Sequence, residues 1–389
     1  MDWPNTKNRG TEMPAHKKQV IADIGRLNAF MDREGLDAVV LRSGMNFTYL
    51  SGVVYPGTLA RLQDLADSER GVLLLWPRDG EPVIVANSIA AALARRDSWV
   101  ARVELHEGYV ESPYSKLCEI LREYRLERAR VGFEKNYVSA RHWEAVQTAL
   151  PNLAMVDCVA MMDRVRWIKT PAEIALLKRG ADALDDAFFA VFPQVRVGHS
   201  ERDVHGMMIH ECLKRGAGWA HGILNSSANT VAYGGEGDTL FRKGDVIRTD
   251  YVAFWDGYPG HQSRNLIFGK PSPQQQREYD GNREIYLGSI ERCRPGARVG
   301  DIYDYVMAAF AKRGWEYKSL LVGHGVGPWW HQQEPILSRG SDVLLEEGMA
   351  LALEPHLDHW HLQDMIVVRN RGPELLSDKF STDAPFVAA

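Results

Sequence analysis

Ionisable and amide side chains stand at both ends of two strand–turn–strand segments. The first segment runs from Asp250 to His261, and the second runs from Glu354 to Gln363. Residues placed symmetrically about a hairpin turn face each other with Cβ atoms roughly 5 Å apart. A first turn centred on Trp255 and Asp256, before Gly257, therefore predicts that Asp250 faces His261. The second segment predicts the same arrangement for its two ends, so we expect two polar pairs around one small ion or one substrate atom.

The strands around the second pair are apolar enough to be buried. They read Met349-Ala-Leu-Ala-Leu-Glu354 before the turn and Met365-Ile-Val-Val368 after it. Burying an ionisable group is costly unless the group has a partner. Ionisable groups at the ends of such strands are therefore candidates for function.

Two further histidines lie within and just after a glycine-rich segment. His324 lies within Gly323-His-Gly-Val-Gly327, where glycines let the backbone approach a ligand closely, and His331 follows Trp330. On its own, His324 is equally consistent with an ordinary turn residue. Its value as a candidate comes from the other polar positions.

Five of these positions together resemble the five-ligand pattern of the creatinase, methionine aminopeptidase and aminopeptidase P superfamily, whose fold is called pita-bread. The five are Asp250, His261, His324, Glu354 and Gln363. The segments Arg-Lys-Gly-Asp245 and Asp364-Met-Ile-Val-Val368 also match the family. The resemblance implies an α+β fold with a pita-bread C-terminal catalytic domain, a smaller α/β creatinase-like N-terminal domain and an enzymatic function.

The expected division of the chain places a polar tail at residues 1–16, the creatinase-like domain at residues 17–166 and the pita-bread domain at residues 167–389. Thr170, Pro171 and Glu173 form a strong helix start just after this boundary. The C-terminal domain contains an internal echo, because Arg-Val-Gly, a helix and Lys-Arg-Gly precede both hairpins. We interpret this as a duplication in which the helix of the first copy is longer by about one turn.

The departures from the family pattern limit the metal content. The metallopeptidases that the chain resembles use Asp, Asp, His, Glu and Glu, but this chain has His261 and Gln363 at the second and fifth positions. Only Asp250 and Glu354 remain to neutralise metal charge, so a second divalent cation would be unpaired. We expect at most one ion, iron, zinc, manganese or nickel. Its predicted ligands are Asp250, His261, His324 and Glu354.

Metal-free catalysis is the alternative, because creatinase relies on a histidine instead of metal ligands. The matching position here is Tyr233. A tyrosine with a pKa of about 10 is a poor base at neutral pH, although it can donate a hydrogen bond to an oxyanion. Without a metal, His261 or His324 would have to carry the proton.

Aromatic residues adjoin the predicted ligands. They are Trp329, Trp330, Trp360 and Tyr258, and for any one of them taken alone packing is favoured over function. As a group they would form an aromatic wall for a cationic or apolar small molecule, with Gln363 as a further substrate contact. The three histidines of the second turn, His356, His359 and His361, are expected at the surface or behind the ligands.

These residues favour a hydrolase that cleaves a carbon–nitrogen bond of amide or amidine type in a small molecule. Glu354 would take a proton from water, His324 and His331 would stabilise the oxyanion, and Tyr233 would orient the leaving group. Three alternatives stay open: an Xaa-Pro metallopeptidase, a lyase that cleaves sulfonium propionates, and a non-catalytic binding module.

Composition excludes several other classes. The 389 residues carry a net charge of −5, with no basic cluster suited to a nucleic acid. The four scattered cysteines indicate reduced thiols, which favours the cytoplasm. No apolar stretch approaches the roughly 20 residues of a membrane helix, and the polar N-terminus lacks the features of an export signal. We expect a cytoplasmic homodimer without a membrane anchor.

Overall fold

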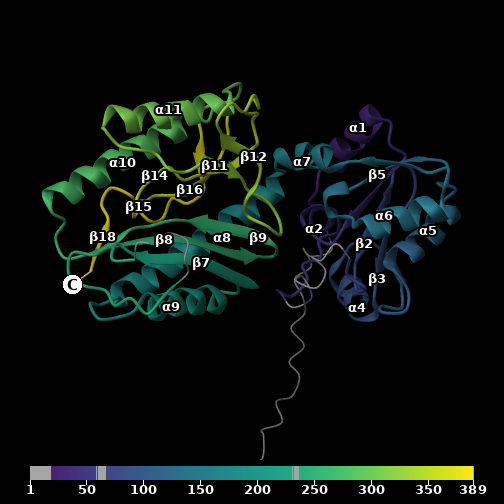
Figure 1. Ribbon diagram of the computed structural model, residues 1–389, viewed down its shortest axis with the longest axis horizontal. Coiled ribbons are helices and arrows are strands. Elements are labelled where there is room, and N and C mark those ends of the chain that lie inside the picture. Colours follow the sequence, from purple (N-terminus) through teal and green to yellow (C-terminus); the bar gives the residue numbers. More distant parts are fainter. Residues whose placement is uncertain (1–18, 58, 60–66, 230, 232–235, 389) are drawn as a thin grey trace, which may run out of the picture.

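The computed structural model describes residues 19–57, 59, 67–229, 231 and 236–388 (Figure 1). The predicted tail of residues 1–16 and Tyr233 lie outside these residues. Two lobes lie side by side in Figure 1, with helix α7 (Val159–Trp167) close to where they meet. The helix predicted from residue 17 begins instead at Ile24, because the Asp23 side chain accepts a hydrogen bond from Arg26 N and caps the helix there.

The N-terminal lobe is a six-stranded sheet with helices on both faces. Its strand order is β4-β3-β2-β1-β5-β6, and β2 runs antiparallel to both β1 and β3. The strands are β1 (Ala38–Arg42), β2 (Leu73–Pro77), β3 (Val83–Ala86), β4 (Arg102–Leu105), β5 (Arg130–Phe133) and β6 (Ala154–Asp157). The helices are α1 (Ile24–Glu34), α2 (Met45–Ser51), α4 (Ser88–Asp97), α5 (Pro113–Glu123), α6 (Ala140–Ala149) and α7, with a short 3-10 turn at Lys135–Tyr137.

Alternating residues of β1 belong to two separate hydrophobic cores. Val39 and Leu41 pack on one face of the sheet, and Ala38 and Val40 pack on the other. This alternation follows from the two-residue period of a strand. The sheet is therefore buried on both faces, as the continuous apolar run around β1 indicates.

A long helix opens the C-terminal lobe. Helix α8 (Pro171–Val191) starts at the predicted capping box, in which the Thr170 side chain accepts from Glu173 N and the Glu173 carboxylate accepts from Thr170 N. A 3-10 turn, Phe192–Gln194, follows it. Glycine at position 180 is required here, because an added Cβ would lie 2.7 Å from Gly260 N on the neighbouring hairpin. Helix and hairpin thus pack backbone to backbone.

The C-terminal lobe is built from two similar halves. The first half contains α8, α9 (Glu201–Lys214), β7 (Trp219–Ser226), β8 (Val246–Trp255), β9 (Tyr258–Gln262) and β10 (Leu266–Phe268). The second contains α10 (Pro273–Glu291), α11 (Val299–Lys312), β11 (Leu321–Gly325), β12 (Gln333–Ser338), β13 (Ala350–Leu353), β14 (His356–Leu357), β15 (Trp360–His361) and β16 (Asp364–Val367). The short strands β17 (Glu374–Leu375) and β18 (Phe386–Ala388) end the chain, and β18 pairs with β10.

The repeated helices differ from the prediction in length. Helices α9 and α11 both have 14 residues, so the first copy is not longer. The reason is that the Arg-Val-Gly tripeptide precedes α9, whereas Val299 and Gly300 already belong to α11. Both helices are followed by a left-handed glycine, Gly216 or Gly314.

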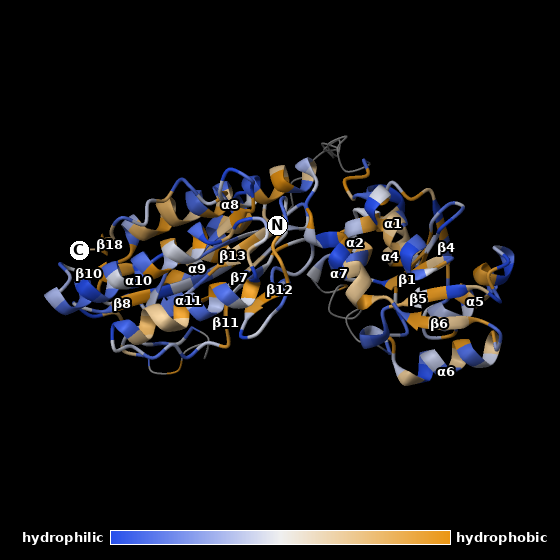
Figure 2. Cartoon of the chain, turned by 90° about the horizontal axis from the view of Figure 1, so that it is seen from above, coloured by the Kyte–Doolittle hydropathy of each residue, from blue (hydrophilic) through white to orange (hydrophobic). Residues whose placement is uncertain are grey.

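The helices cover the outer faces of the two C-terminal sheets. Strands of the N-terminal lobe such as β1 are mostly hydrophobic, whereas the helices mix hydrophobic and hydrophilic residues (Figure 2). Within the described residues, no helix has the length and apolar character needed to span a membrane. The inner faces of the two sheets carry the polar residues predicted as functional.

Candidate active site

The turn of the first hairpin lies one residue further along the chain than its sequence symmetry suggests. Strands β8 and β9 are joined by Asp256 and Gly257, whose φ angles are 50° and 83°. Positive φ at both positions is typical of a type I′ turn, so Gly257 belongs inside the turn. The register pairs Val252 with His261, and Asp250 is therefore a diagonal neighbour of His261 rather than its direct partner. The two still share one face, with Asp250 Oδ1 3.8 Å from His261 Nδ1.

The second hairpin has the predicted register. Leu353 pairs with Asp364, and His356 pairs with His361. The residues between these pairs, Glu354 and Gln363, therefore stand symmetrically about the turn. An isolated bridge between Ser263 and Gln363 joins the end of the first hairpin to the second.

Two histidines from different halves direct ring nitrogens at each other. His261 Nδ1 donates to Tyr251 O over 3.2 Å, and His324 Nδ1 donates to Gly325 O over 2.9 Å. These bonds leave both Nε2 atoms without a proton in the neutral rings. The two Nε2 atoms lie 3.3 Å apart, and the side-chain amide of Gln363 also reaches His261 Nε2.

His331 completes a group of three imidazoles. One ligand atom each from His261, His324 and His331 lies within 4.8 Å of the others. The His331 Nδ1 atom is buried and has no hydrogen-bond partner among the described residues. The His221 ring lies 5.3 Å from the His331 ring, and its Nε2 also has no hydrogen-bond partner among those residues. We call these four residues the histidine cluster.

The histidine cluster is electrically neutral. Burial lowers the pKa of both His261 and His324 to about 3. Burial also lowers the pKa of His331 far below its usual value, and the neighbouring imidazoles add to that shift. Neutral imidazoles with free nitrogens are the form that binds transition metals.

The two carboxylates stand at the edge of the histidine cluster. Glu354 Oε1 lies 3.8 Å from His324 Nε2. Burial raises the pKa of Glu354 to about 8, the charge of Asp250 adds to the shift, and the guanidinium of Arg248 opposes it. Burial likewise raises the pKa of Asp250, and the positive charge of Arg248 again opposes that shift. The site can therefore hold a proton on a carboxyl group.

A pair of divalent ions does not fit these residues. Two ions would bring four positive charges to two carboxylates, in a site that already contains the buried guanidinium of Arg248. One ion fits, because the nitrogens of His261, His324 and His331 already converge. The convergent nitrogens include His331, which was not among the predicted ligands, whereas the carboxylates of Asp250 and Glu354 lie 3.8 Å from His261 and His324.

Of the predicted aromatic wall, Trp330 lies beside the histidine cluster. Its ring is parallel to that of His221 with a centroid distance of 5.7 Å, and it packs on His331 at 4.6 Å. Tyr258 lies elsewhere: it is 2% exposed, packs among core residues against α8, and donates to Glu173 over 3.1 Å. Trp329 is held through its backbone, which donates to Gly257 O.

The sequence prediction missed His221 and Arg248. His221 pairs with Val252 on the face that carries Asp250, and Arg248 lies two positions before Asp250 on the same face. The alternation of strand residues would have identified Arg248. His361 is fully buried behind Glu354, one of the two positions expected for it, with Nε2 3.8 Å from Glu354 Oε2 and Nδ1 3.1 Å from Ser263 Oγ.

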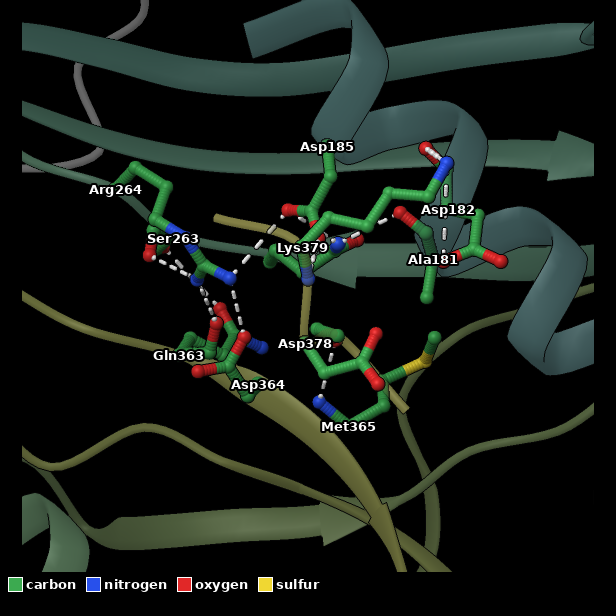
Figure 3. A network of polar contacts seen from close by, with 12 residues as sticks. Ala181, Asp182, Asp185, Ser263, Arg264, Gln363, Asp364, Met365, Asp378 and Lys379 are labelled. Carbon is green, nitrogen blue, oxygen red and sulfur yellow. Dashed lines mark hydrogen bonds and ion pairs between the residues drawn. The ribbon is translucent and has the colours of Figure 1, made fainter. Parts of the chain in front are cut away.

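A second buried polar group, the arginine cluster, adjoins the site. Arg264 reaches Asp364 over 2.6 Å and Asp185 over 3.4 Å, and it donates to the carbonyls of Ser263 and Gln363 (Figure 3). Tyr286 OH donates to the second oxygen of Asp364. These side chains come from α8, α10, β16 and the segment after β9, so the cluster ties the two halves together.

The chain matches two known protein families, one over each lobe. Residues 175–370 match the model of metallopeptidase family M24, and residues 24–168 match the Creatinase/Prolidase N-terminal domain. The chain is similar to the Xaa-Pro dipeptidase of Lactobacillus helveticus, with 25% identity over 346 residues that cover 86% of this chain and 89% of the relative. Methionine aminopeptidase of Aquifex aeolicus is 25% identical over 248 residues, covering 53% of this chain and 96% of the relative.

Solved structures show the same fold. The X-Pro aminopeptidase from Thermotoga maritima superposes with a TM-score of 0.80 at 19% identity, covering 94% of this chain and 100% of that one. The Xaa-Pro dipeptidase from Bacillus anthracis gives a TM-score of 0.80 at 21% identity, covering 94% and 99%. The predicted α+β fold, with a creatinase-like N-terminal domain and a pita-bread C-terminal domain, is confirmed.

Proposed function

This chain belongs to metallopeptidase family M24, and from that premise we propose that it hydrolyses an amide or amidine bond in a small molecule with at most one metal ion. Cleavage of a carbon–nitrogen bond is the activity of the family, whereas the substrate and the metal count are proposals specific to this chain. A homodimeric state and a cytoplasmic location remain predictions.

One observation carries the proposal: neutral imidazole nitrogens converge where a two-metal enzyme needs carboxylates. His261 and Gln363 place their Nε2 atoms next to each other. At these two positions a two-metal enzyme has two carboxylates, which supply four anionic oxygens. A neutral centre does not compensate two divalent cations. A chain with this substitution therefore requires chemistry that works with one ion or with protein groups alone.

We assign each protein group a role from its position. His261, His324 and His331 would hold the ion, which would supply a Lewis acid for the substrate carbonyl and for water. Glu354, beside His324, accepts the proton of the attacking water and returns it to the leaving nitrogen. The Gln363 amide orients His261, and Trp330 covers the substrate beside His331. Tyr233 would orient the leaving group.

Xaa-Pro peptidase activity is the second candidate. The relatives from Lactobacillus helveticus and Bacillus anthracis are named Xaa-Pro dipeptidases, and the first covers most of this chain. This candidate requires the carboxylate-poor centre to support peptide hydrolysis. Turnover of Xaa-Pro dipeptides with added manganese or cobalt, together with two bound metal equivalents, would favour it over the one-ion proposal.

A substrate screen tests the proposal. Purified wild-type protein, with its metal content measured, is incubated with panels of small amides, amidines and Xaa-Pro dipeptides, and the released amine is quantified. We expect amine release from an amide or amidine, and loss of that release in Glu354→Gln. Release of an alkene from a sulfonium propionate, without any amine, would replace the hydrolase proposal by the lyase alternative.

A further inference from the structure

A buried arginine at the end of the N-terminal lobe reaches into the C-terminal lobe. Arg166, on α7, is 2% exposed and donates through Nε to Asn46 over 2.6 Å. A second nitrogen of its guanidinium bonds to Asp163, and the third donates to the side-chain oxygen of Gln333, the first residue of β12. The rigid fork of Arg166 thus connects two elements of its own lobe to the other lobe.

The N-terminal side of this connection is firmly anchored. Asn46 donates to Glu134 Oε1 over 2.7 Å, and Glu134 Oε2 accepts from Arg42 N over 2.6 Å. Asn46 and Glu134 are both buried. Because each of these side chains fixes the next, the position of the Arg166 guanidinium is set by the sheet of the N-terminal lobe.

The C-terminal side of the connection ends at the loop that carries His331. Gln333 Nε2 donates to Pro328 O over 2.8 Å and to Trp330 O over 2.7 Å. Gln333 is buried, and its amide uses its oxygen for Arg166 and both of its protons for the loop. The Gln333 side chain, which Arg166 orients, thus holds the loop from Pro328 to Gln333 in addition to the strand pairing of Gly325 with Gln333 at its base.

The same loop has a strained backbone. Trp329 adopts a φ of 72°, a conformation that residues other than glycine rarely hold. Such a residue persists only where its surroundings fix it. The described backbone contact of Trp329 is a bond from its N–H to Gly257 O, in the turn of the first hairpin. The loop is thus fixed at Gly257 on one side and by Gln333 and Arg166 on the other.

We propose that Arg166 is a positioning residue: it makes the N-terminal lobe part of the active site by holding, through Gln333, the loop that presents His331 to His261 and His324. His331 is the member of the three-imidazole group that comes from a loop, whereas His261 and His324 lie on strands β9 and β11. A loop histidine needs external support to keep its ring in the group. The catalytic part of this proposal rests on the proposed function, whereas the placement of the loop does not.

Hydrogen exchange measured by mass spectrometry tests the placement without any substrate. In Arg166→Met, amides of the segment 326–333 should exchange at least about tenfold faster than in the wild type, with the rest of the C-terminal lobe unchanged. Arg164→Met is the matched control, because Arg164 is an exposed residue on the same helix. Unchanged exchange in the loop, or an equal increase throughout the protein, would overturn the proposal.

Gln333→Glu provides a second variant that keeps the link to Arg166 as an ion pair. It removes both amide protons that close the loop, so it should loosen segment 326–333 even if Arg166→Met fails to fold. Loop exchange equal to that of the wild type in Gln333→Glu would show that the side chain of Gln333 does not hold the loop.

A double-mutant cycle then tests whether Arg166 acts through His331. With a substrate from the screen, Arg166→Met should lower kcat about ten- to a hundredfold with a smaller change in KM. Arg166→Met combined with His331→Gln should be no slower than His331→Gln alone. Additive losses would refute the connection through His331. If His331→Gln is fully active, the proposed role of His331 fails, while the exchange experiment still decides the placement.

Discussion

The arginine cluster and the histidine cluster are adjacent, but Arg264 and its carboxylates are buried whereas His221 and His331 are partly exposed, and the polar atoms of the two clusters are satisfied in different ways. In the arginine cluster each terminal nitrogen of Arg264 has oxygen partners, two carbonyls or two carboxylates. In the histidine cluster two Nε2 atoms face each other, and His331 Nδ1 has no hydrogen-bond partner in the described part of the chain. The charges of the first cluster are compensated within the protein, although Arg264 Nε has no hydrogen-bond partner within the described ranges, whereas the second cluster offers nitrogens to a ligand.

The energetic meaning of the two clusters differs accordingly. Pairing opposite charges compensates the cost of removing them from water, so breaking one partner leaves a large penalty. Buried nitrogens without partners cost stability in the folded protein and recover it when a ligand binds. We therefore expect changes in the arginine cluster to affect folding, and changes in the histidine cluster to affect binding and catalysis.

The largest effect is expected for Arg264→Met. This variant leaves Asp364 and Asp185 buried without their cation, which should lower the free energy of unfolding by about 3–5 kcal/mol. Urea denaturation measures the change. Arg283→Met is the control, because the partner of Arg283 is 79% exposed and its loss should cost below about 1 kcal/mol. Equal free energies of unfolding in the two variants would contradict the expected role of the arginine cluster in folding.

Glu354→Gln should affect turnover rather than folding. The amide keeps the size of the side chain but does not accept a proton, so we expect kcat to fall by about 10²–10⁴. Unfolding free energy should stay the same or rise, because a buried group whose pKa is raised to about 8 is replaced by a neutral one. Near-normal turnover would mean that the second hairpin is a structural element only.

Metal content tests the contrast between the neutral histidine cluster and the charged arginine cluster. Mass spectrometry of the wild type after dialysis should find at most one transition-metal equivalent per chain. The double change His261→Asp and Gln363→Glu supplies the missing carboxylates and should raise binding towards two equivalents. Its activity need not follow, because a substrate pocket depends on more than the ligands. Two tight equivalents in the wild type would contradict the charge argument.

The smallest effect is expected for Tyr233→Phe. A hydrogen bond to the transition state is worth about 1–3 kcal/mol, so kcat should fall far less than in Glu354→Gln. Steady-state kinetics of both variants with one substrate provides the measurement. A loss as large as that of Glu354→Gln would make Tyr233 an essential proton carrier.

Strand ends and their polar residues were predictable, but the register of the first hairpin was not. Glu354 and Gln363 lie symmetrically about their turn as expected. The position of Asp250 shifted because Gly257 stands inside a type I′ turn, and a pattern of apolar residues does not fix turn type. Composition and spacing thus identified which residues form the site, but not how these residues are placed relative to one another.

Contacts between distant segments left no sequence signal. His221 reaches the site because β7 pairs with β8 in one register, and that register depends on the packed sheet. The link between Arg166 and Gln333 joins two lobes and follows no local pattern. Such contacts depend on tertiary packing, which propensity and periodicity do not encode.

The bridge between Ser263 and Gln363 has a consequence for the order of folding. Each hairpin can form from residues close in sequence, but the bridge joins residues that are 100 positions apart. Contacts of such long range form late, because the intervening chain must be closed first. A folding intermediate with either half formed would thus lack the metal-binding group. Recovery of metal binding during refolding would report closure of the whole C-terminal lobe, rather than formation of its secondary structure.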